Sequence, residues 1–449
     1  MPFDRRALLA SGLATAGLAT AAAAAGPRAQ AKGQAASASL FAPEGDGDQT
    51  QALQAAIDAA AQRGAPLLLA PRLFRVGRIT LRPNTRLIGS ARQTVLEFTG
   101  GNAFLVGRDA PGVRLESLVI DGSLLAIDAA EGTGLVSLTN CDGLALADLD
   151  VRRGLLNGVA LTSCSGRVSD CDVRGMSQAG LFSLDARGLD LSHNAVMDCA
   201  NNGIQVWRSA PGEDGTTVTA NRISRIATKG GGTGQNGNGV NVFRAGGVIV
   251  SANRIEDCAY SAIRGNSADN IQMTGNSCRK IGEVALYAEF AFSGALIANN
   301  LVDDAASGIA VTNFNDGGRL AVVQGNVVRN LFRREFEPVD KRGIGIGIEA
   351  DAAVSGNVIE DAPTAGISAG WGPYLRDVAI TGNLIRKAGI GIMVSADPKA
   401  GPCLISQNMI SATKDGAIRA MDHGTAHGPD LALDAPAGGR LAISGNLAV

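Results

Sequence analysis

The sequence contains few aromatic residues and almost no excess charge. Only 4% of its 449 residues are Phe, Trp or Tyr, and 40 Lys and Arg stand against 42 Asp and Glu, for a net charge of −2. Proteins that bind nucleic acid without sequence specificity need a basic surface, and no basic stretch with interleaved aromatics occurs here. We therefore expect no nucleic-acid partner.

Motifs that hold metals are also scarce. The seven cysteines never form a Cys-x-x-Cys pair, which disfavours zinc and iron–sulfur centres. The three histidines are His193, His423 and His427. The last two are spaced like metal ligands on a helix, but Gly424 and Gly428 indicate a loop. We therefore predict no metal site.

Glycine, in contrast, is abundant. The chain has 59 glycines, well above the average of about 7%. Hydrophobic residues make up 45% of the chain and charged residues 18%, which suits a packed core rather than a disordered chain. Length alone predicts two to four domains of about 100–200 residues each. Regularly placed glycines, however, indicate regularly placed turns.

Residues 1–31 have the pattern of an export signal. Arg5-Arg6 precedes an Ala- and Leu-rich run over residues 7–25, and an Ala-x-Ala cleavage site ends at Ala31. The paired arginines resemble a twin-arginine signal, which implies the twin-arginine export machinery as a partner and a periplasmic or secreted location. A membrane span is the alternative, but the run is rich in Ala, Gly and Thr rather than Leu and Ile. We expect no membrane segment in the mature form.

A short phrase recurs along the chain at intervals of 23 to 38 residues. It reads apolar-x-apolar-x-x-Asn-x-apolar, and its asparagines are Asn194, Asn221, Asn253, Asn276, Asn300, Asn326, Asn357, Asn383, Asn408 and Asn446. Three earlier copies carry Leu118, Leu149 and Cys171 at the Asn position. A second phrase, Gly-Ile/Val-x-apolar, lies between these copies and begins at Gly203, Gly239, Gly308, Gly366 and Gly389.

Both phrases alternate apolar and other residues with the period of a half-buried strand. Each repeat therefore has two or three short strands separated by turns, and it cannot bury its apolar face alone. Stacked repeats bury a continuous core, so the sequence predicts an all-β fold, a parallel β-helix over residues 113–449. A leucine-rich repeat has a similar Leu-x-Leu-x-x-Asn core, but the second strand phrase and the preference for Ile and Val disfavour it.

The repeated asparagine suits a sharp corner between two strands. Asn and Gly tolerate left-handed backbone best, so we expect Asn in that conformation, with a preceding Gly such as Gly275 keeping the corner tight. At about 4.8 Å per coil, stacked Asn side chains can hydrogen-bond along the axis as a ladder. These asparagines are therefore predicted to be structural.

The segment before the repeats has a different pattern. Leu53, Ala56, Ile57 and Ala60 have the spacing of an amphipathic helix, and a Leu-x-x-Pro segment and a strand follow it. This order looks like the N-terminal cap of right-handed β-helix proteins of the pectate-lyase-like superfamily, where a cap covers the open end of the solenoid. The predicted organisation is a signal peptide (1–31), a linker (32–45), a cap helix with the first coils (46–112) and β-helix repeats (113–449).

Signal, cap and Asn repeats together resemble the twin-arginine-translocated, functionally uncharacterised β-helix-repeat family, over nearly the whole chain. The export route of that family implies a bound cofactor of unknown identity. The wider superfamily includes pectate lyases, polygalacturonases, and alginate epimerases and lyases, which implies a polysaccharide ligand, including one that contains uronates. The Gly-His-Gly motif of polygalacturonases and the Asp-Pro-His-Asp motif of epimerases are absent from this sequence.

In this superfamily the substrate usually lies on the outer face of the strand that carries the Gly-Ile phrase. The period of two directs Ile204 and Val206 inward and Gln205 and Trp207 outward. Later coils extend two outward rows, one through Asn241, Arg264, Tyr287 and Ala310 and the other through Phe243, Asn266, Glu289, Thr312 and Glu349. Aromatic rings stack on sugars and polar groups orient them, so we predict a saccharide site with these outward-pointing binding residues: Trp207, Phe243, Asn241, Asn266 and Tyr287.

Glu289, Glu349 and Arg264 are the predicted catalytic residues of this face. An Arg beside carboxylates can recognise a uronate or stabilise an enolate-like intermediate. Glycosidases use two carboxylates about 5–9.5 Å apart, and Glu289 and Glu349 would lie two coils, or about 10 Å, apart. Ordinary solvated charge is the alternative. Two long segments, 229–238 and 331–338, are expected to wall the same face.

The cysteines leave one structural alternative open. Cys141 and Cys164 occupy equivalent positions in adjacent coils, so a disulfide between them is permitted, whereas buried, stacked thiols are the default.

Three functions remain open from the sequence. The first is a polysaccharide-binding protein or a polysaccharide lyase, hydrolase or epimerase. The second is a non-catalytic periplasmic module that binds a partner or an envelope glycan, and the third is a carrier of an unidentified cofactor. Convergence of Trp207, Phe243, Arg264 and Glu289 in one cleft would favour the first function, and scattering would favour the second.

Overall fold

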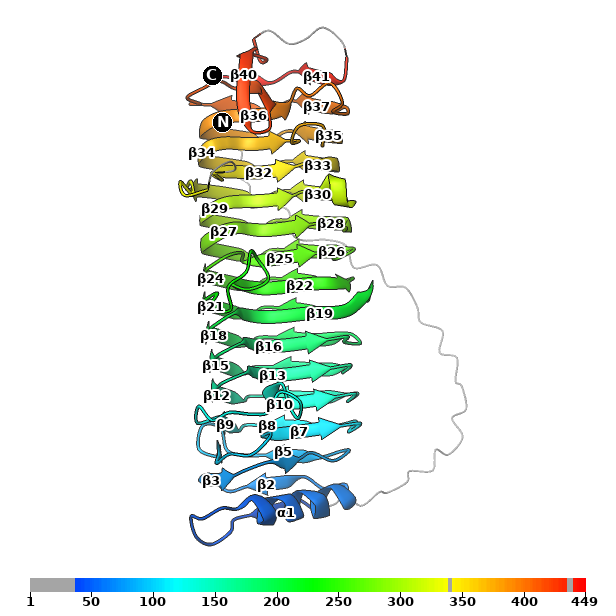
Figure 1. Ribbon diagram of the computed structural model, residues 1–449, viewed down its shortest axis with the longest axis vertical. Helices are drawn as coiled ribbons and strands as arrows, with labels where there is room; N and C mark the ends of the chain where they lie inside the picture. Colours follow the sequence, from blue (N-terminus) through cyan, green and yellow to red (C-terminus); the bar gives the residue numbers. More distant parts are fainter. Residues whose placement is uncertain (1–36, 338–340, 434–438) are drawn as a thin grey trace, which may run out of the picture. The chain divides into compact units, whose positions relative to one another are not determined.

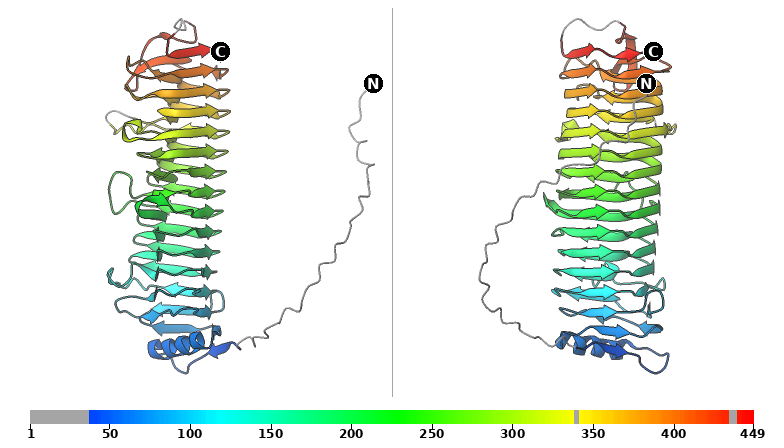
Figure 2. Two further views of the ribbon diagram at one scale, coloured as in Figure 1. Left: turned by 90° about the vertical axis from the view of Figure 1, so that its right-hand side faces the viewer. Right: turned by 180° about the vertical axis from the view of Figure 1, so that it is seen from behind.

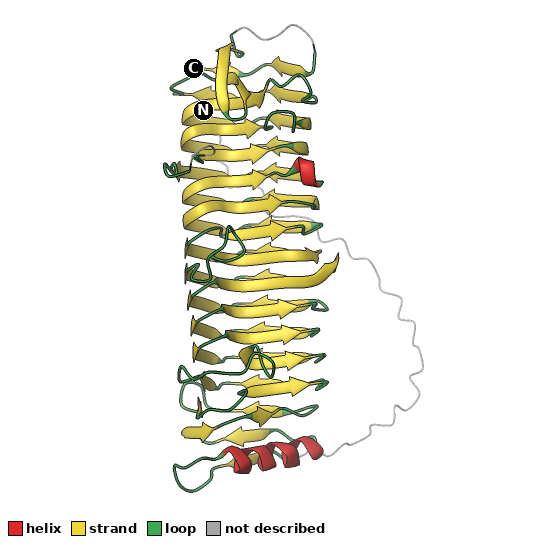
Figure 3. Ribbon diagram, in the orientation of Figure 1, coloured by secondary structure: helices red, strands yellow, loops and turns green. Residues whose placement is uncertain are grey.

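A computed structural model describes residues 37–337, 341–433 and 439–449. The predicted signal peptide and cleavage site lie outside these residues. Across the described ranges, the chain winds into a parallel β-solenoid of about 15 turns, with one α-helix at its N-terminal end (Figures 1 and 3). No helix within these ranges is long and apolar enough to cross a membrane.

Each coil contains up to three short strands, and each strand pairs in parallel with its equivalents in the coils before and after it. We call the three positions the first, second and third face. The first face is one 16-stranded sheet. Its strands are β1 (Ser39–Phe41), β2 (Leu67–Leu69), β5 (Arg86–Ile88), β8 (Arg114–Glu116), β11 (Leu144–Ala147), β14 (Gly166–Ser169), β17 (Leu189–Ser192), β20 (Thr217–Thr219), β23 (Ile249–Ser251), β26 (Ile271–Thr274), β28 (Ser293–Ala298), β30 (Arg319–Gln324), β33 (Ala350–Ser355), β35 (Arg376–Thr381), β37 (Cys403–Ser406) and β41 (Leu441–Ser444).

The second and third faces are joined into one larger sheet, because several strands run through the corner between them. The second face holds β3 (Leu73–Val76), β6 (Val95–Phe98), β9 (Val119–Asp121), β12 (Asp150–Gly154), β15 (Asp172–Met176), β18 (Ala195–Cys199), β21 (Arg222–Ile226), β24 (Arg254–Cys258), β31 (Val327–Leu331), β38 (Met409–Ser411) and β42 (Leu447–Ala448). The third face holds β4 (Ile79–Thr80), β7 (Leu105–Arg108), β10 (Gly134–Thr139), β13 (Asn157–Thr162), β16 (Ala179–Leu184), β19 (Asn202–Glu213), β22 (Asn238–Gly246), β25 (Ile263–Asn266), β32 (Ile344–Ile348) and β39 (Ile418–Asp422). Strands that span both faces are β27 (Ser277–Glu289), β29 (Leu301–Val311), β34 (Val358–Ala369) and β36 (Leu384–Ser395).

The helix α1 (Thr50–Gln62) covers the first coils, as the amphipathic spacing predicts. Its buried residues are Leu53, Ile57 and Ala60, which pack into the same core as the strands. Asp48 accepts a 2.8 Å hydrogen bond from the backbone N–H of Thr50 at the start of the helix. The strand β1 lies inside the segment 32–45 that the sequence presents as a linker, and it pairs with β2.

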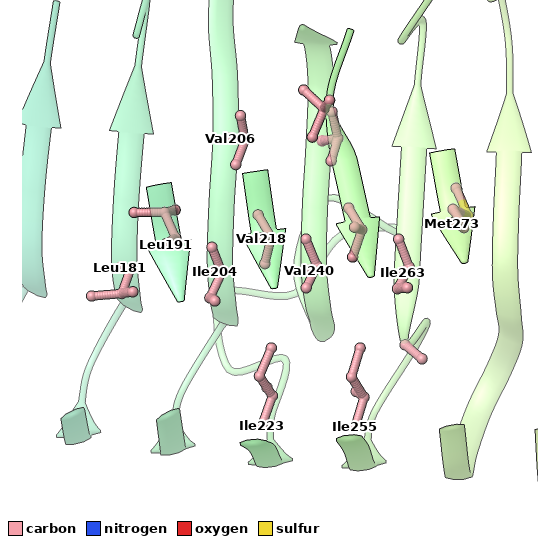
Figure 4. Packing of buried hydrophobic residues seen from close by; sticks show 14 of the residues in the cluster. Leu181, Leu191, Ile204, Val206, Val218, Ile223, Val240, Ile255, Ile263 and Met273 are labelled. Atoms are coloured by element: carbon pink, nitrogen blue, oxygen red, sulfur yellow. The ribbon is translucent and has the colours of Figure 1, made fainter. Parts of the chain in front are cut away.

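The core consists of columns of equivalent aliphatic side chains, one from each coil. Leu181, Ile204, Val240 and Ile263 follow one another at the same register position of the third face (Figure 4). Each is almost fully buried, and burial of such a side chain is worth about 1.5–3 kcal/mol. The period-two alternation that directs Ile204 and Val206 inward is confirmed.

The predicted asparagine ladder is present. Asn276 donates from Nδ2 to Oδ1 of Asn300 over 3.0 Å and to the carbonyl of Val250 over 3.0 Å, and its backbone N–H donates to the same Oδ1 over 2.9 Å. The side-chain contact repeats at each step from Asn194 to Asn446. Each amide therefore satisfies buried backbone groups of the preceding coil, as Asn276 does for the Asn253 N–H and the Val250 carbonyl, and it donates to the asparagine side chain of the next coil.

Two details of the repeat differ from the sequence prediction. The left-handed residue of the corner precedes the asparagine, as at His193 (φ 58°), Ala252 (φ 56°) and Gly275 (φ 66°). The asparagine itself keeps ordinary backbone, because its side chain must point inward along the ladder. The second phrase in the late coil begins at Gly391 rather than Gly389, since Ile367 pairs with Ile392.

The other sequence expectations concern His423, His427 and the cysteines. The segment of the two histidines is a hairpin rather than a loop, because β40 (Thr425–Asp430) pairs antiparallel with β39. All seven cysteines are free and buried, so the permitted disulfide is not formed. A hydrogen bond between the thiols of Cys141 and Cys164 lowers the pKa of Cys141 to about 7.

Candidate functional site

The outer surface of the third face carries the predicted aromatic residues in the predicted order. Trp207 pairs with Phe243, which pairs with Asn266, and Asn266 pairs with Glu289. Trp207 and Phe243 are half-buried rather than exposed, and their rings meet edge to face at 5.8 Å. Trp207 Nε1 also donates a 3.0 Å hydrogen bond to Asn241 Oδ1. The aromatic rings therefore pack against one another and do not stand free on the surface.

The glycine-rich segment 229–238 lies on this part of the face. Asn202 and Asn241 donate hydrogen bonds to the carbonyl of Gln235, and Asn238 donates to that of Gly234. A side chain at Gly234 would collide with the guanidinium of Arg264, so only glycine permits this close approach. Figure 2 shows that the long loops leave the stack on one side.

Beneath this segment lies a set of paired charges, which we call the arginine–glutamate cluster. Its members are Arg264, Glu283, Glu289, Arg334, Glu337 and Arg342. Arg264 binds both carboxylate oxygens of Glu289, at 2.6 and 2.9 Å, and its third nitrogen lies 3.3 Å from Glu283. The side chains of Arg264 and Glu289 are 9% and 2% exposed. Asn266 adds a further 3.0 Å hydrogen bond to Glu289.

This arrangement favours a structural role for Arg264 and Glu289 over the predicted catalytic one. An acid or base must exchange protons with a ligand, whereas both oxygens of Glu289 face donors of the protein itself. The cation neutralises the carboxylate in place, and the pair fixes the outer face beneath the loop.

A cavity of about 410 Å³ lies next to the cluster on the same face. Its floor follows the outward row beyond Tyr287, where successive coils place Ala310, Gly347 and Ser368 before Met393. These three small side chains leave the surface hollow, while Tyr287 and Met393 stand at the two ends of the floor. The volume falls within the usual range of ligand sites.

One wall of the cavity is basic. Arg333, Lys341 and Arg342 line it, all from the segment that precedes β32. Arg333 donates to the Thr364 hydroxyl over 2.9 Å, Lys341 pairs with Glu335 at 3.0 Å, and Arg342 pairs with Glu283 at 3.0 Å. Arg342 therefore links the cavity to the arginine–glutamate cluster.

Glu349 is the acidic residue among the side chains that line the cavity. Its Oε2 accepts a 2.7 Å hydrogen bond from the backbone N–H of Phe314. Burial raises the pKa of Glu349 above its ordinary value, and the backbone hydrogen bonds from Phe314 and Asn313 offset only part of this effect. Burial likewise raises the pKa of the neighbouring Tyr287 to about 12, which keeps its phenol protonated.

The remaining wall is aromatic. Trp371 is half-buried and lines the cavity together with Gly424, which comes from the turn between β39 and β40. His423 from the same turn meets the Trp371 ring edge to face at 5.8 Å, and its Nδ1 lies 2.6 Å from Asp422. The cavity thus combines an aromatic ring, cations and one carboxyl whose pKa is raised, which are groups able to contact both the face of a ring and an anion.

Comparison with protein families assigns the fold of the chain. The model described as the right handed beta helix region matches residues 157–327 and 211–396, which together exceed half of the chain. The chain belongs to the right-handed β-helix family. No curated protein sequence matches this β-helix protein.

Several solved structures share the β-helix fold at low sequence identity. They include the catalytic unit of a thermostable GH87 alpha-1,3-glucanase from Streptomyces thermodiastaticus, with 15% identity, coverage of 95% of this chain and 70% of the glucanase, and a TM-score of 0.48. A mannuronic acid specific polysaccharide family 6 lyase from human gut microbiota has 11% identity, coverage of 89% and 93%, and a TM-score of 0.47. The A-module of the mannuronan C-5 epimerase AlgE6 from Azotobacter vinelandii has 15% identity, coverage of 90% and 96%, and a TM-score of 0.38.

The β-helix separates the predicted site residues into two groups. Tyr287 and Glu349 line the cavity. The other predicted residues lie beside or beneath the glycine-rich segment, outside the cavity lining: Trp207, Phe243, Asn241, Asn266, Arg264 and Glu289. The predicted residues therefore do not converge in one cleft.

Sequence reasoning missed most of the cavity. Continuing the outward row past Ala310 would have found the run of small residues Gly347 and Ser368. The chain has two tryptophans, and Trp371 belongs to a turn rather than to either strand phrase. Across the described ranges, no group of three or more His, Cys, Asp or Glu is arranged to hold a metal.

Proposed function

We propose that this β-helix protein binds an acidic saccharide in the Glu349 cavity, after export to the periplasm or the cell exterior. The observation that carries the proposal is the composition of the cavity: three cations, one half-buried carboxyl and the Trp371 ring around a floor of small residues. A uronate carboxylate suits the basic wall, and a sugar face suits the indole. The export step rests on the twin-arginine pattern of residues 1–31.

The basic wall provides a direct test with a matched control. Lys341 and Lys387 are 46% and 48% exposed, and each pairs with one Glu, at 3.0 and 2.9 Å. Only Lys341 lines the cavity, whereas Lys387 lies at the corner between the second and third faces. Lys341→Ala should weaken binding of uronate oligosaccharides about tenfold in calorimetry, since a charge-assisted contact is worth about 1.5–3 kcal/mol.

Lys387→Ala should bind like the unaltered protein, and neutral oligosaccharides should bind neither variant. Equal affinities of the Lys341→Ala variant and the unaltered protein for every uronate tested would remove the proposed site.

A second candidate function is proton abstraction from the carbon beside the uronate carboxylate, as in a lyase or epimerase. Glu349 favours this function, because a raised pKa makes its carboxylate a stronger base. The cations of the basic wall can stabilise an enolate-like intermediate. A two-carboxylate hydrolase is less well supported, since Glu349 is the acidic lining residue and Glu289 is held by Arg264. Ultraviolet absorbance of an unsaturated product, lost in Glu349→Gln, would distinguish a lyase from a binding protein.

A further inference from the structure

The cavity is bounded at both ends of the solenoid axis, and this bears on the length of ligand it accepts. Its floor extends from Tyr287 to Met393 along one outward row. The two residues are separated by four coil steps, which is about 19 Å at about 4.8 Å per step. A polysaccharide that ran along the solenoid would have to pass over both boundaries.

The boundary near Tyr287 is built from charged side chains under a loop. The Arg264 guanidinium lies 5.0 Å from the Tyr287 ring, and Glu289 and Glu283 hold it there. The glycine-rich segment rests on Arg264 at Gly234. Each of these charged side chains is at most 9% exposed. The cavity therefore does not continue as an open groove beyond Tyr287.

The boundary near Met393 is built by the β39–β40 hairpin. Ala426 of β40 packs against a small separate core that contains Met393 and Met421, and Figure 1 shows β40 crossing in front of β36. Asp430 at the end of β40 accepts hydrogen bonds from the backbone N–H groups of Ala417 and Ile418, at 2.6 and 3.0 Å, and so holds β40 against the start of β39. The turn then reaches Trp371 through Gly424. This end is also closed by packed side chains.

From these two boundaries we infer that the site takes the end of an acidic saccharide chain, or a short acidic oligosaccharide, and not the interior of a polymer. The inference rests on the proposed function and adds the length class of the ligand. A chain end can enter a cavity that is closed along the axis, whereas an internal segment needs an exit at each end.

Binding stoichiometry on polymers of different length tests this inference with the unaltered chain. The probes are polygalacturonate and polymannuronate fractions of defined mean length, with the corresponding trisaccharides. End recognition predicts one protein bound per chain at every length, so a tenfold longer fraction binds no more protein per chain. Binding in proportion to chain length would overturn the inference while leaving the proposed function intact. If no acidic saccharide binds, whether short or long, both the inference and the proposed function are overturned.

Modified chain ends supply an independent measurement. One trisaccharide sample is reduced at its reducing end, and a second is altered at its non-reducing end. Recognition of an end predicts that at least one modification weakens binding roughly tenfold, because buried partners of the cavity lose their hydrogen bonds. Equal affinities for both modified samples and the parent would overturn end recognition. The readout is the fluorescence of Trp371 in a Trp207→Phe variant, which leaves a single indole in the chain.

Discussion

At the scale of single residues, two glutamates of the same outward row have different surroundings. Glu289 is enclosed by Arg264 and Asn266, whereas Glu349 lines the cavity and accepts hydrogen bonds from the backbone of Phe314 and Asn313. Arg264 holds both carboxylate oxygens of Glu289, whereas burial raises the pKa of Glu349 and so favours its neutral form. The row therefore places a structural carboxylate and a protonatable one two coils apart.

Glu349 should make the stability of the protein depend on pH in a defined direction. Its folded-state pKa is raised by burial, so the fold prefers the protonated carboxyl. This contribution to stability is present below the unfolded pKa of about 4.3 and is lost as the pH rises through the folded value. Glu349→Gln keeps an acceptor for the Phe314 N–H without the charge. We expect its melting temperature to match that of the unaltered protein at about pH 4 and to exceed it near pH 7.

Glu360→Gln is the matched control for this measurement. Hydrogen bonding from Lys387 lowers the pKa of Glu360, so its contribution to stability is present above the unfolded pKa and is lost as the pH falls. Its substitution should therefore lower, and not raise, the melting temperature near pH 7. Identical pH profiles for the two variants would contradict the assignment of Glu349 as a half-buried carboxyl that forms no ion pair within the described ranges.

At the scale of elements, the asparagine corner joins the first face to the second in most coils. Asn300 accepts from both the backbone N–H and the side-chain amide of Asn276, and it donates to Met273 and Asn326. Removal of the Asn300 amide thus takes away the partner of the Asn276 backbone N–H, of the Asn276 side-chain amide and of the Met273 carbonyl, all in the preceding coil. The ladder is a unit whose members depend on their neighbours.

Substitution of a central ladder residue should cost more than substitution at its last described step. Asn300→Ala leaves the buried donors of Asn276 unsatisfied, at about 1–3 kcal/mol for each such group. Asn446 accepts from Asn408 in the same way but is half-buried, so water can replace the lost acceptor more easily and Asn446→Ala should cost less. Urea unfolding followed by circular dichroism measures both midpoints. A larger loss for Asn446→Ala than for Asn300→Ala would contradict the dependence of the cost on burial, and negligible losses for both would show that the ladder contributes little.

The elements of this fold could be predicted from the sequence because their causes are local. The period of two placed Trp207 and Glu289 in the correct outward row, and the Asn phrase located the corners. The covering of that row could not be predicted, since it depends on the path of the 229–238 segment across three coils. The position of Trp371 could not be predicted for the same reason, because it depends on the hairpin turn at Gly424, more than 50 residues further along the chain.

At the scale of the whole described solenoid, stability is distributed unevenly along the stack. Coils in the middle are covered on both sides by their neighbours, and α1 covers the first coils. The last coils are less well covered, because Leu441 and Ile443 are only partly buried and Leu447 is 55% exposed. Repeat proteins are stabilised mainly by contacts between neighbouring repeats, so the poorly covered coils should open at the lowest free energy.

Alkylation of the seven cysteines can measure which coils open at the lowest free energy. All are buried, from Cys141 to Cys403, and burial raises the pKa of Cys199 and Cys403 to about 12, which keeps both thiols protonated and unreactive. We expect no alkylation of Cys199 or Cys403 in the native protein on a short time scale. Under mild urea Cys403, which lies nearest the poorly covered coils, should react before Cys199, Cys258 and Cys278 in the middle.

Mass spectrometry of the alkylated peptides gives the order of labelling. Full denaturation without reductant should yield seven labelled sites, whereas five would reveal a Cys141–Cys164 disulfide. Simultaneous labelling of all sites would instead mean that the solenoid unfolds as one cooperative unit, because then no coil opens without the rest.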